Sequence, residues 1–348
     1  MKSVLLPIKT LYWLLEENNP PIRNLTKKFI QNKALSKTEI DRVNEYPPIK
    51  KIISLIKPNG AWSNQKEPYK KYTGDYWQLI FLCDLNANPN DLIHKACMNI
   101  LSFQLPEGGF THKIGSKFQL ICLTANIIRS LTHFGINDER TQKGISFITN
   151  HILENQGAFC TPDPLYTLLP DCQMALTKVL AMYATLNHDR LNSNIQKAIN
   201  IIVEKILENR IFRYLPNGSK EYYNLIKGKK SEEIRKIRKQ FLLNPEKLEK
   251  NEIKKSWLKF GFPQSYSSDA LETLYWLSMS KIAYHKEFEE TLNHVIKSMN
   301  PSGYWINQIA FRNPMLAEIE PKKAPSKWLT FRACFVLKNY SELVFQDS

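Results

Sequence analysis

The sequence predicts an all-α fold, an α/α toroid of about six helix pairs that close into a ring. Two observations support this prediction. A turn of glycine followed by an aromatic residue recurs about every 48 positions, and two different helical patterns alternate around it. Strand-type alternation of apolar and polar residues is not found along the sequence. The 348 residues exceed the ~250–300 that one hydrophobic core usually serves, and repeats that share a core account for this length.

The glycine-aromatic turns set the repeat length. Four of them are clear in the sequence: Gly60-Ala61-Trp62, Gly108-Gly109-Phe110, Gly157-Ala158-Phe159 and Gly303-Tyr304-Trp305. The first three aromatic residues are 48 and 49 positions apart, and the gap of 146 before the last is close to three repeats. Two degenerate copies are therefore expected in between, at Phe212 and Tyr214 and at Trp257, Phe260 and Phe262.

Each repeat is expected to contain an outer helix before the turn and an inner helix after it. The stretch Ile195–Ile206 has apolar residues at i, i+3, i+4 spacing, as in a helix with one wet face. Phe118–Phe134, Leu176–Leu186 and Ala270–Leu277 are apolar on nearly every side, which is typical of buried helices. An open superhelix of HEAT type has similar repeats, but helices buried all round need a shared centre, and this favours the closed ring.

The predicted organisation is a single toroid domain over residues 1–348 with a basic helical insertion at 217–256. The insertion holds ten Lys, two Arg and six Glu, so its net charge of +6 is two-fifths of the chain's +15. Within 231–243, Ile234, Ile237 and Phe241 fall on one helical face among basic residues. Such a helix can lie on an anionic membrane surface or pack on the toroid, and both interpretations stay open. No zinc-finger, Rossmann or helix-turn-helix motif accompanies the charge, so nucleic acid is not an expected partner.

The sequence also indicates a cytoplasmic protein. Its six cysteines show no paired CxxC spacing, which fits reduced thiols better than a disulfide framework. No apolar run reaches the ~20 residues of a membrane-spanning helix. The apolar run Val4–Ile8 is followed by Lys9 and by no small-residue cleavage site, so a secretory signal is not expected.

With these turns, the sequence resembles the α/α-toroid superfamily of terpenoid cyclases and protein prenyltransferase β-subunits. It is more closely similar to a group of functionally unassigned prokaryotic proteins with such repeats. The resemblance covers nearly the whole chain except 217–256, and the matching residues fall within Cys122–Gly135, Cys172–Leu180, Trp257–Glu272 and Ser326–Ala333. It implies an enzyme of isoprenoid or lipid metabolism that acts on an apolar substrate in the central cavity. The alternative is a non-catalytic toroid that binds a lipid, a peptide or a partner protein.

Squalene-type cyclases protonate an alkene with an Asp-x-Asp-Asp run, and the sequence contains no such run. The candidate catalytic acids are therefore Asp171, Asp269 and Glu272. The last two fall at the start of an expected inner helix. Because a carboxylate in that position is also a common helix cap, capping is the competing interpretation.

Prenyltransferase β-subunits hold zinc with Asp, Cys and His, the first two as Asp-x-Cys. Here Asp171 and Cys172 are adjacent, which separates their side chains by ~100° on a helix instead of ~200°. A different zinc site is one hypothesis, with Cys122, Cys160 and Cys172 as thiolate ligands and His112 or Asp171 as the fourth. The alternative is that these cysteines pack as small apolar residues.

The candidate substrate-binding residues are aromatic and basic side chains of the inner helices. Trp77, Tyr183, Trp276 and Trp328 either line a cavity suited to an isoprenoid chain or belong to the core. Lys327 and Arg332 lie beside Trp328, where they either meet a phosphate or pair with a buried carboxylate. The expected ligand is therefore an apolar small molecule or lipid.

Overall fold

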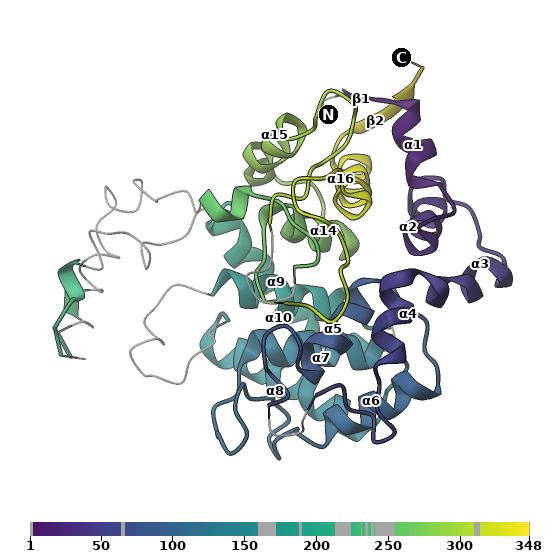
Figure 1. The fold of residues 1–348 in the computed structure, drawn as a ribbon. Helices are drawn as coiled ribbons and strands as arrows, with labels where there is room; N and C mark the ends of the chain where they lie inside the picture. Colours follow the sequence, from purple (N-terminus) through teal and green to yellow (C-terminus); the bar gives the residue numbers. More distant parts are fainter. Residues whose placement is uncertain are drawn as a thin grey trace.

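The structure, a computed structural model, describes residues 3–63, 67–158, 172–187, 190–212, 224–230, 255–264, 266–309 and 314–347, with isolated positions between 232 and 240. Over these residues the protein is all-α apart from one pair of short strands (Figure 1). Within them, no helix combines the length and the hydropathy needed to traverse a bilayer.

Five inner helices follow one another around the middle of the molecule. They are α5 (Asp75–Asp84), α7 (Ile121–His133), α9 (Gln173–Ala184), α14 (Ala270–Met279) and α16 (Lys327–Tyr340). Each packs against the next in this order. All residues of α14 from Ala270 to Ser278 are buried, as the prediction of apolar helices without a wet face requires.

The outer helices alternate with the inner helices along the chain, and in Figure 1 α6 and α8 lie at the lower edge of the molecule. They are α4 (Pro47–Ser54), α6 (Asp91–Leu101), α8 (Glu139–Asn155), α10 (Ser193–Glu208) and α15 (Glu289–Lys297), the last preceded by the 3-10 turn η6 (Lys286–Phe288). In α10 the buried side chains recur with the predicted helical spacing from Ile195 to Ile206. The expectation of one buried and one wet face is therefore confirmed for this helix.

The glycine-aromatic turns connect outer to inner helices by a repeated set of hydrogen bonds. The backbone N–H of the turn aromatic donates to a side chain in the first turn or two of the next inner helix. The pairs are Trp62 to Asp75 at 2.7 Å, Phe110 to Thr124 at 2.9 Å and Trp305 to Thr330 at 3.1 Å. Both indoles donate at 2.8 Å to the carbonyl ten residues earlier, Ile52 and Val295, on the preceding outer helix.

The glycines of these turns are required by backbone conformation and by space. Gly60 and Gly108 have φ of +82° and +109°, where a side chain is strained. A Cβ would lie 2.4 Å from the carbonyl oxygen of Lys95 or 2.5 Å from that of Lys143. Each turn therefore fits directly against the outer helix of the next repeat.

The N-terminal segment closes the ring. It contains strand β1 (Ser3–Pro7), helices α1 (Ile8–Leu14) and α2 (Pro20–Leu25), the π-helix η1 (Thr26–Ile30), α3 (Lys37–Asp41) and the 3-10 turn η2 (Arg42–Glu45). β1 pairs in parallel with β2 (Glu342–Gln346), so the two ends of the described chain lie side by side at the top of Figure 1. Thr10 Oγ1 donates to the carbonyl of Gly303 at 3.2 Å, which places α1 on the last glycine-aromatic turn.

Contacts on either side of this segment complete the circle. Helix α2 and η1 pack against α16 on one side; on the other, α2 contacts η2, and η2 packs against α4, the outer helix that contacts α5. Lys338 of α16 donates to the carbonyls of Phe29 and Ile30 at 2.8 and 3.0 Å. Helix α1 thus takes an outer position and α2 with η1 an inner position, which makes six pairs among the described residues.

The prediction of about six pairs is therefore right, but the predicted positions of two of them are wrong. Phe212 and Phe262 were expected to mark separate repeats. Between them the described residues, which include the short 3-10 turn η5 (Lys255–Leu258), contain no complete helix pair. The sixth pair lies in the N-terminal segment, whose sequence contains no glycine-aromatic turn that would predict it. Most of the predicted basic insertion, 217–256, lies outside the described residues.

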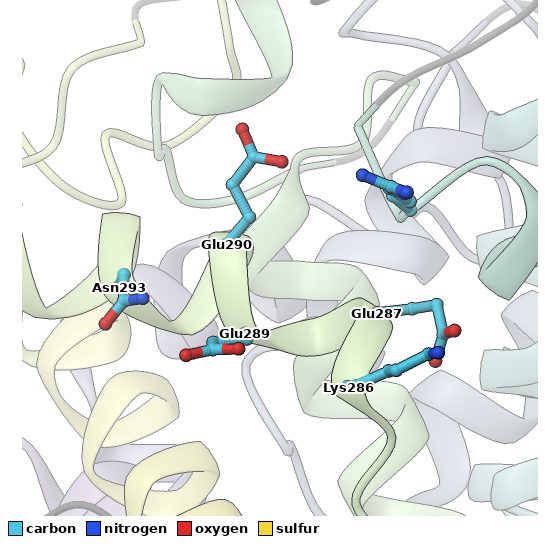
Figure 2. Close-up of a pocket in the computed structure, with 6 residues that line it drawn as sticks. Lys286, Glu287, Glu289, Glu290 and Asn293 are labelled. Atoms are coloured by element: carbon cyan, nitrogen blue, oxygen red, sulfur yellow. The ribbon is translucent and has the colours of Figure 1, made fainter. Parts of the chain in front are cut away.

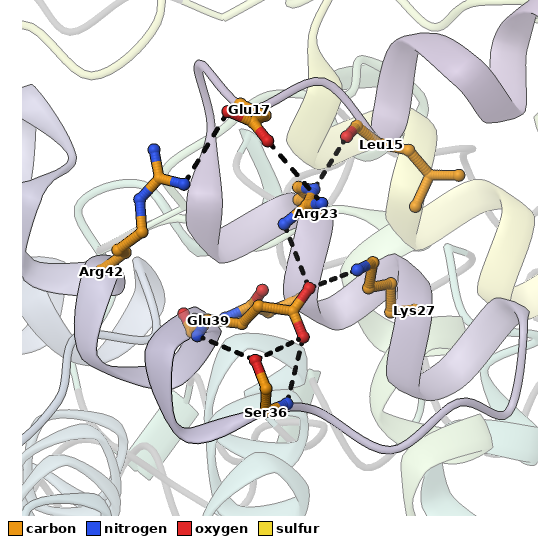
Figure 3. A network of polar contacts seen from close by, with 8 residues as sticks. Leu15, Glu17, Arg23, Lys27, Ser36, Glu39 and Arg42 are labelled. Carbon is orange, nitrogen blue, oxygen red and sulfur yellow. Dashed lines mark hydrogen bonds and ion pairs between the residues drawn. The ribbon is translucent and has the colours of Figure 1, made fainter.

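A polar network fixes the N-terminal segment internally (Figure 3). Glu39 accepts from Arg23 Nη1 at 3.1 Å, from Lys27, and from the backbone N–H of Ser36 at 3.0 Å. Ser36 and Glu39 form a capping box that starts α3. These contacts, with the hydrogen bond from Lys27 as the largest influence, lower the pKa of Glu39 from 4.5 to about 2.

Candidate functional site

A cavity of about 320 Å³ lies at the centre of the ring. Its wall comes from all five inner helices and from the N-terminal segment. The lining residues are Asn24, Leu25, Lys28, Phe29, Leu35, Ile40, Cys83, Asp84, Asn86, Arg129, His133, Thr185, Tyr275, Trp276, Met279, Trp328, Phe331 and Arg332. This volume is at the lower end of the ~300–1,000 Å³ range of small-molecule sites.

One side of the cavity is aromatic. Tyr275 and Trp276 of α14 face Trp328 and Phe331 of α16, and the Tyr275 and Phe331 ring centroids are 6.3 Å apart at 67°. The Trp328 ring stacks on Phe262 with centroids 4.5 Å apart. Burial raises the pKa of Tyr275, so its hydroxyl is neutral and available as a hydrogen-bond donor.

An ion pair also lines the cavity, next to Trp276. Arg129 Nη2 of α7 lies 2.5 Å from Asp84 Oδ1 at the end of α5, and both side chains are at most 7% exposed. The Arg129 guanidinium is 5.4 Å from the ring centroid of Trp276. The pair joins the C-terminal ends of two neighbouring inner helices. It engages the carboxylate of Asp84, which lines the cavity.

Arg332 of α16 is a second buried guanidinium on this wall. It is 5% exposed, and its Cζ lies 5.0 Å from the Phe262 ring and 5.1 Å from the Tyr275 ring. Its Nη1 is buried and has no hydrogen-bond partner among the described residues. A positive charge is therefore held against the cavity by aromatic contacts and without the ion pair that Arg129 makes.

The electrostatic balance of the wall is positive. It contains three cationic side chains, Lys28, Arg129 and Arg332, against the one carboxylate of Asp84. His133 adds no charge at neutral pH, because burial lowers its pKa and outweighs the raising effect of the hydrogen bond between its Nε2 and the carbonyl of Ala87 at 2.8 Å. The polar groups that face the space are thus mainly hydrogen-bond donors.

The two described candidate acids lie outside this wall. Asp269 is the N-cap of α14 and accepts from the backbone N–H of Glu272 at 2.8 Å and of Gly261 at 3.1 Å. Burial raises its pKa to about 7. Both carboxylate oxygens of Glu272 accept from Lys178 Nζ, at 2.7 and 2.9 Å. The structure therefore gives each a structural contact, while Asp171 lies outside the described residues.

The six predicted substrate-binding residues divide into two sets. Trp276, Trp328 and Arg332 line the cavity. Trp77 packs against Tyr69, Tyr72 and Tyr266 near the start of α5, and Tyr183 turns outward to α8, where its hydroxyl is 2.9 Å from Thr149 Oγ1. Lys327 binds Glu16 at 2.8 Å and Asn18 at 2.6 Å, so its ammonium joins α16 to the N-terminal segment.

The predicted zinc ligands are only partly described. Cys122 lies in the first turn of α7 and Cys172 is the N-cap of α9, both partly exposed, as expected for the starts of adjacent inner helices. His112 packs edge-on against Tyr69 and Phe118. Cys160 lies outside the described residues, and within the described part of the chain no group of three or more His, Cys, Asp or Glu could hold a metal ion. The zinc site stays a prediction.

Sequence reasoning missed Asp84 and Arg129 as lining residues, whereas Tyr275 was among the inner-helix aromatic residues expected to line a cavity or belong to the core. A signal for both was present: Arg129 is the one Lys, Arg, Asp or Glu of α7, and Asp84 ends α5, whose other acidic residue, Asp75, is at its start. A buried charge requires a partner or a ligand. The 45 positions between Asp84 and Arg129 are close to one repeat, which places them at similar heights on neighbouring helices.

A second hollow of about 480 Å³ lies on the outside of the ring, at the start of α15 (Figure 2). It is lined by Arg210, Lys286, Glu287, Glu289, Glu290 and Asn293. In Figure 2 the carboxylates of Glu289 and Glu290 point away from each other. The central cavity, where charged and aromatic side chains converge, is the better candidate site.

The fold and site define an all-α ring of helix pairs with a small, positively charged and aromatic central cavity. Two solved structures of the type II terpene cyclase MstE from Scytonema are similar to this chain at 12% identity. The complex of an MstE variant with merosterolic acid A, its product, has a TM-score of 0.33 and covers 88% of this chain and 99% of the cyclase. The apo form has a TM-score of 0.32, with 85% and 96% covered. No protein-family model and no curated protein matches the chain.

Proposed function

We propose that the chain is a binding protein for an apolar small molecule, of lipid or isoprenoid type, which occupies the central cavity. The observation that carries the proposal is the cavity wall itself, where Tyr275, Trp276, Trp328 and Phe331 enclose one side of a 320 Å³ space. Aromatic and apolar walls with a few polar groups are typical of small-molecule sites.

Binding is favoured over catalysis by what the acids do. The one carboxylate among the lining residues, Asp84, is engaged by Arg129, and the described candidate acids Asp269 and Glu272 make helix-cap and ion-pair contacts. An acid that protonates a substrate must lie within reach of it. The described wall offers a place to hold a molecule and no unengaged carboxylate to protonate one.

An enzyme of isoprenoid metabolism is the second candidate. The aromatic ring faces beside the cavity favour it, because such faces stabilise a cationic intermediate. Incubation of the purified protein with prenyl diphosphates and mass-spectrometric analysis of the products separates the two functions. A cyclised or transferred product that disappears in Asp84→Asn would overturn the non-catalytic proposal.

Binding itself is tested by calorimetry with 2-naphthalenemethanol, a neutral aromatic probe. The natural sequence should bind it at one site. Thr185→Trp places an indole at the cavity wall and should abolish binding, whereas Gln142→Trp on the exposed face of α8 should leave it unchanged. Absence of binding, or equal binding by Thr185→Trp, would contradict the proposed function.

A further inference from the structure

Among the described residues, two buried cations of the inner helices form ion pairs with carboxylates of a neighbouring inner helix, and a third does not. Asp84 of α5 binds Arg129 of α7, and Lys178 of α9 binds Glu272 of α14. Arg332 of α16 is buried to the same degree and has no such carboxylate among the described residues. Its charge acts on Asp269 and Glu320, but both of these carboxyls accept hydrogen bonds at helix starts and their burial raises each pKa to about 7.

On the cavity wall, Arg332 has further hydrogen-bond donors beside it. Trp276 Nε1 is buried on the same wall and lacks a hydrogen-bond partner within the described part of the chain. The hydroxyl of Tyr275 belongs to the ring that Arg332 contacts, and the positive charges of Arg332 and Arg129 both act on it. A neutral apolar ligand would leave these donors unsatisfied, which costs about 1–3 kcal/mol for each buried group.

We propose that the ligand of the central cavity is an apolar molecule that carries one carboxylate, and that Arg332 binds this carboxylate. The inference rests on the proposed function and specifies its ligand class. Arg332 Nη1 donates to one carboxylate oxygen, and Trp276 Nε1 and the Tyr275 hydroxyl are the further donors of the same wall. The aromatic side chains Trp328 and Phe331 contact the apolar body.

The chemistry of the site favours a carboxylate. A guanidinium presents donors in a plane that matches the two oxygens of a carboxylate. Phe262 and Tyr275 hold the Arg332 group by ring contacts, so its position does not depend on a protein carboxylate that a ligand would have to displace. Three cations against one carboxylate on the wall leave an excess of positive charge for an anion to compensate.

The test compares two probes of nearly equal shape, 2-naphthoate and 2-naphthalenemethanol, by calorimetry on the full chain near neutral pH. The charged hydrogen bonds should make the naphthoate bind about 10- to 100-fold more tightly than the alcohol. In Arg332→Gln this preference should fall to about 1, while binding of the alcohol persists. Arg140→Gln removes an exposed arginine of α8 that pairs with Asp138 and should keep the full preference.

The outcomes separate the two proposals. Binding of the alcohol without any preference for naphthoate would overturn the carboxylate inference and leave the cavity as an apolar site. Binding of neither probe would overturn both. Preserved preference in Arg332→Gln would also overturn the inference, because a purely structural role of Arg332 predicts a changed melting temperature without a changed ratio of affinities.

Discussion

Two cations of the ring are buried to a similar extent and have opposite surroundings. Lys178 on α9 is 3% exposed, and its ammonium reaches both carboxylate oxygens of Glu272. Arg332 on α16 is 5% exposed and contacts two aromatic rings, with Nη1 unpaired among the described residues. The inner helices thus contain one buried cation that is paired with a carboxylate, Lys178, and one that lines the cavity without an ion pair among the described residues, Arg332.

The difference distinguishes a part of the ring whose buried charges neutralise each other from a part where a buried charge faces the cavity. The Lys178–Glu272 pair, with Thr177 and Thr273 hydroxyls 2.9 Å apart beside it, fixes α9 against α14. At Arg332 the fold retains a buried charge that forms no ion pair among the described residues, a feature that packing alone would not select. Excess polar capacity beside a cavity is the feature expected of a binding site, where stability is given up for function.

The largest predicted effect comes from opening the closed pair. Lys178→Met removes the ammonium and leaves Glu272 buried without its partner, so the free energy of unfolding should fall by about 3–5 kcal/mol. Urea unfolding monitored by circular dichroism measures this change. Lys205→Met, at a half-buried lysine of α10 whose partner Glu208 is exposed, is the matched control and should cost under about 1 kcal/mol.

A double variant shows whether the pair or the packing is responsible. Lys178→Met combined with Glu272→Met removes both charges and keeps the apolar volume, so most of the stability should return. If the double variant is as unstable as Lys178→Met, the loss comes from poor packing of methionine and the charge argument is wrong.

Arg332→Met should raise the free energy of unfolding, which Lys178→Met lowers. Removing an unpaired buried charge relieves a desolvation penalty of several kcal/mol, while the lost cation–π contacts to two rings are worth up to about 2 kcal/mol each when desolvated. The ligand-free protein should therefore gain about 1 kcal/mol in stability, visible as a higher melting temperature. A loss of stability as large as that of Lys178→Met would show that Arg332 is a structural residue of the ring.

The sequence predicted the ring better than it predicted these charges. The turns at Trp62, Phe110 and Trp305 each need a glycine at positive φ followed by an aromatic side chain. Because these residues are close in sequence, each turn can be recognised from the sequence of its own repeat. The N-terminal pair was missed because α1 and α2 carry no such turn and are fixed by distant partners such as Gly303.

Pairing partners were not predictable for the same reason. Lys178 and Glu272 are separated by 94 positions with the whole predicted basic insertion between them, and nothing local links them. Arg332 was recognised as a candidate because it lies in an apolar helix beside Trp328. Its lack of an ion pair among the described residues is a property of the assembled ring, where the carboxylates of Asp84 and Glu272 are engaged by other cations and those of Asp269 and Glu320 accept other hydrogen bonds.

The two carboxyls near Arg332, those of Asp269 and Glu320, make the stability of the folded protein depend on pH. Burial raises the pKa of Asp269 and of Glu320 to about 7, so the folded protein takes up protons near neutral pH that the unfolded chain binds only near pH 4. Stability should therefore rise, by about 1 kcal/mol, as pH falls from about 8 to about 6.5. Thermal unfolding across this range measures the slope.

Glu320→Gln should flatten this slope by removing one of the two titrations, and an unchanged slope would contradict the assignment. The window ends near pH 6.5 for a physical reason. Burial lowers the pKa of His133 and of His151 in the folded protein. Below pH 6.5, the ordinary pKa of histidine, these two side chains are therefore protonated in the unfolded chain but stay neutral in the folded protein, which favours unfolding. Stability should level off or fall at lower pH.

The smallest effect is expected at the Glu39 network, which has more partners than Lys178 but lies near solvent. Arg23, Lys27 and Ser36 all contact the carboxylate, yet Arg23 and Lys27 are 22 and 23% exposed. Water and salt screen such pairs, so Glu39→Gln should cost only about 0.5–1 kcal/mol at neutral pH. The lowered pKa adds a signature: this contribution is present above pH 4.5 and disappears as pH falls toward about 2. The difference between Glu39→Gln and the natural sequence should therefore vanish in acid. A cost at neutral pH comparable to that of Lys178→Met would mean that the number of partners, and not burial, decides what an ion pair contributes to this fold.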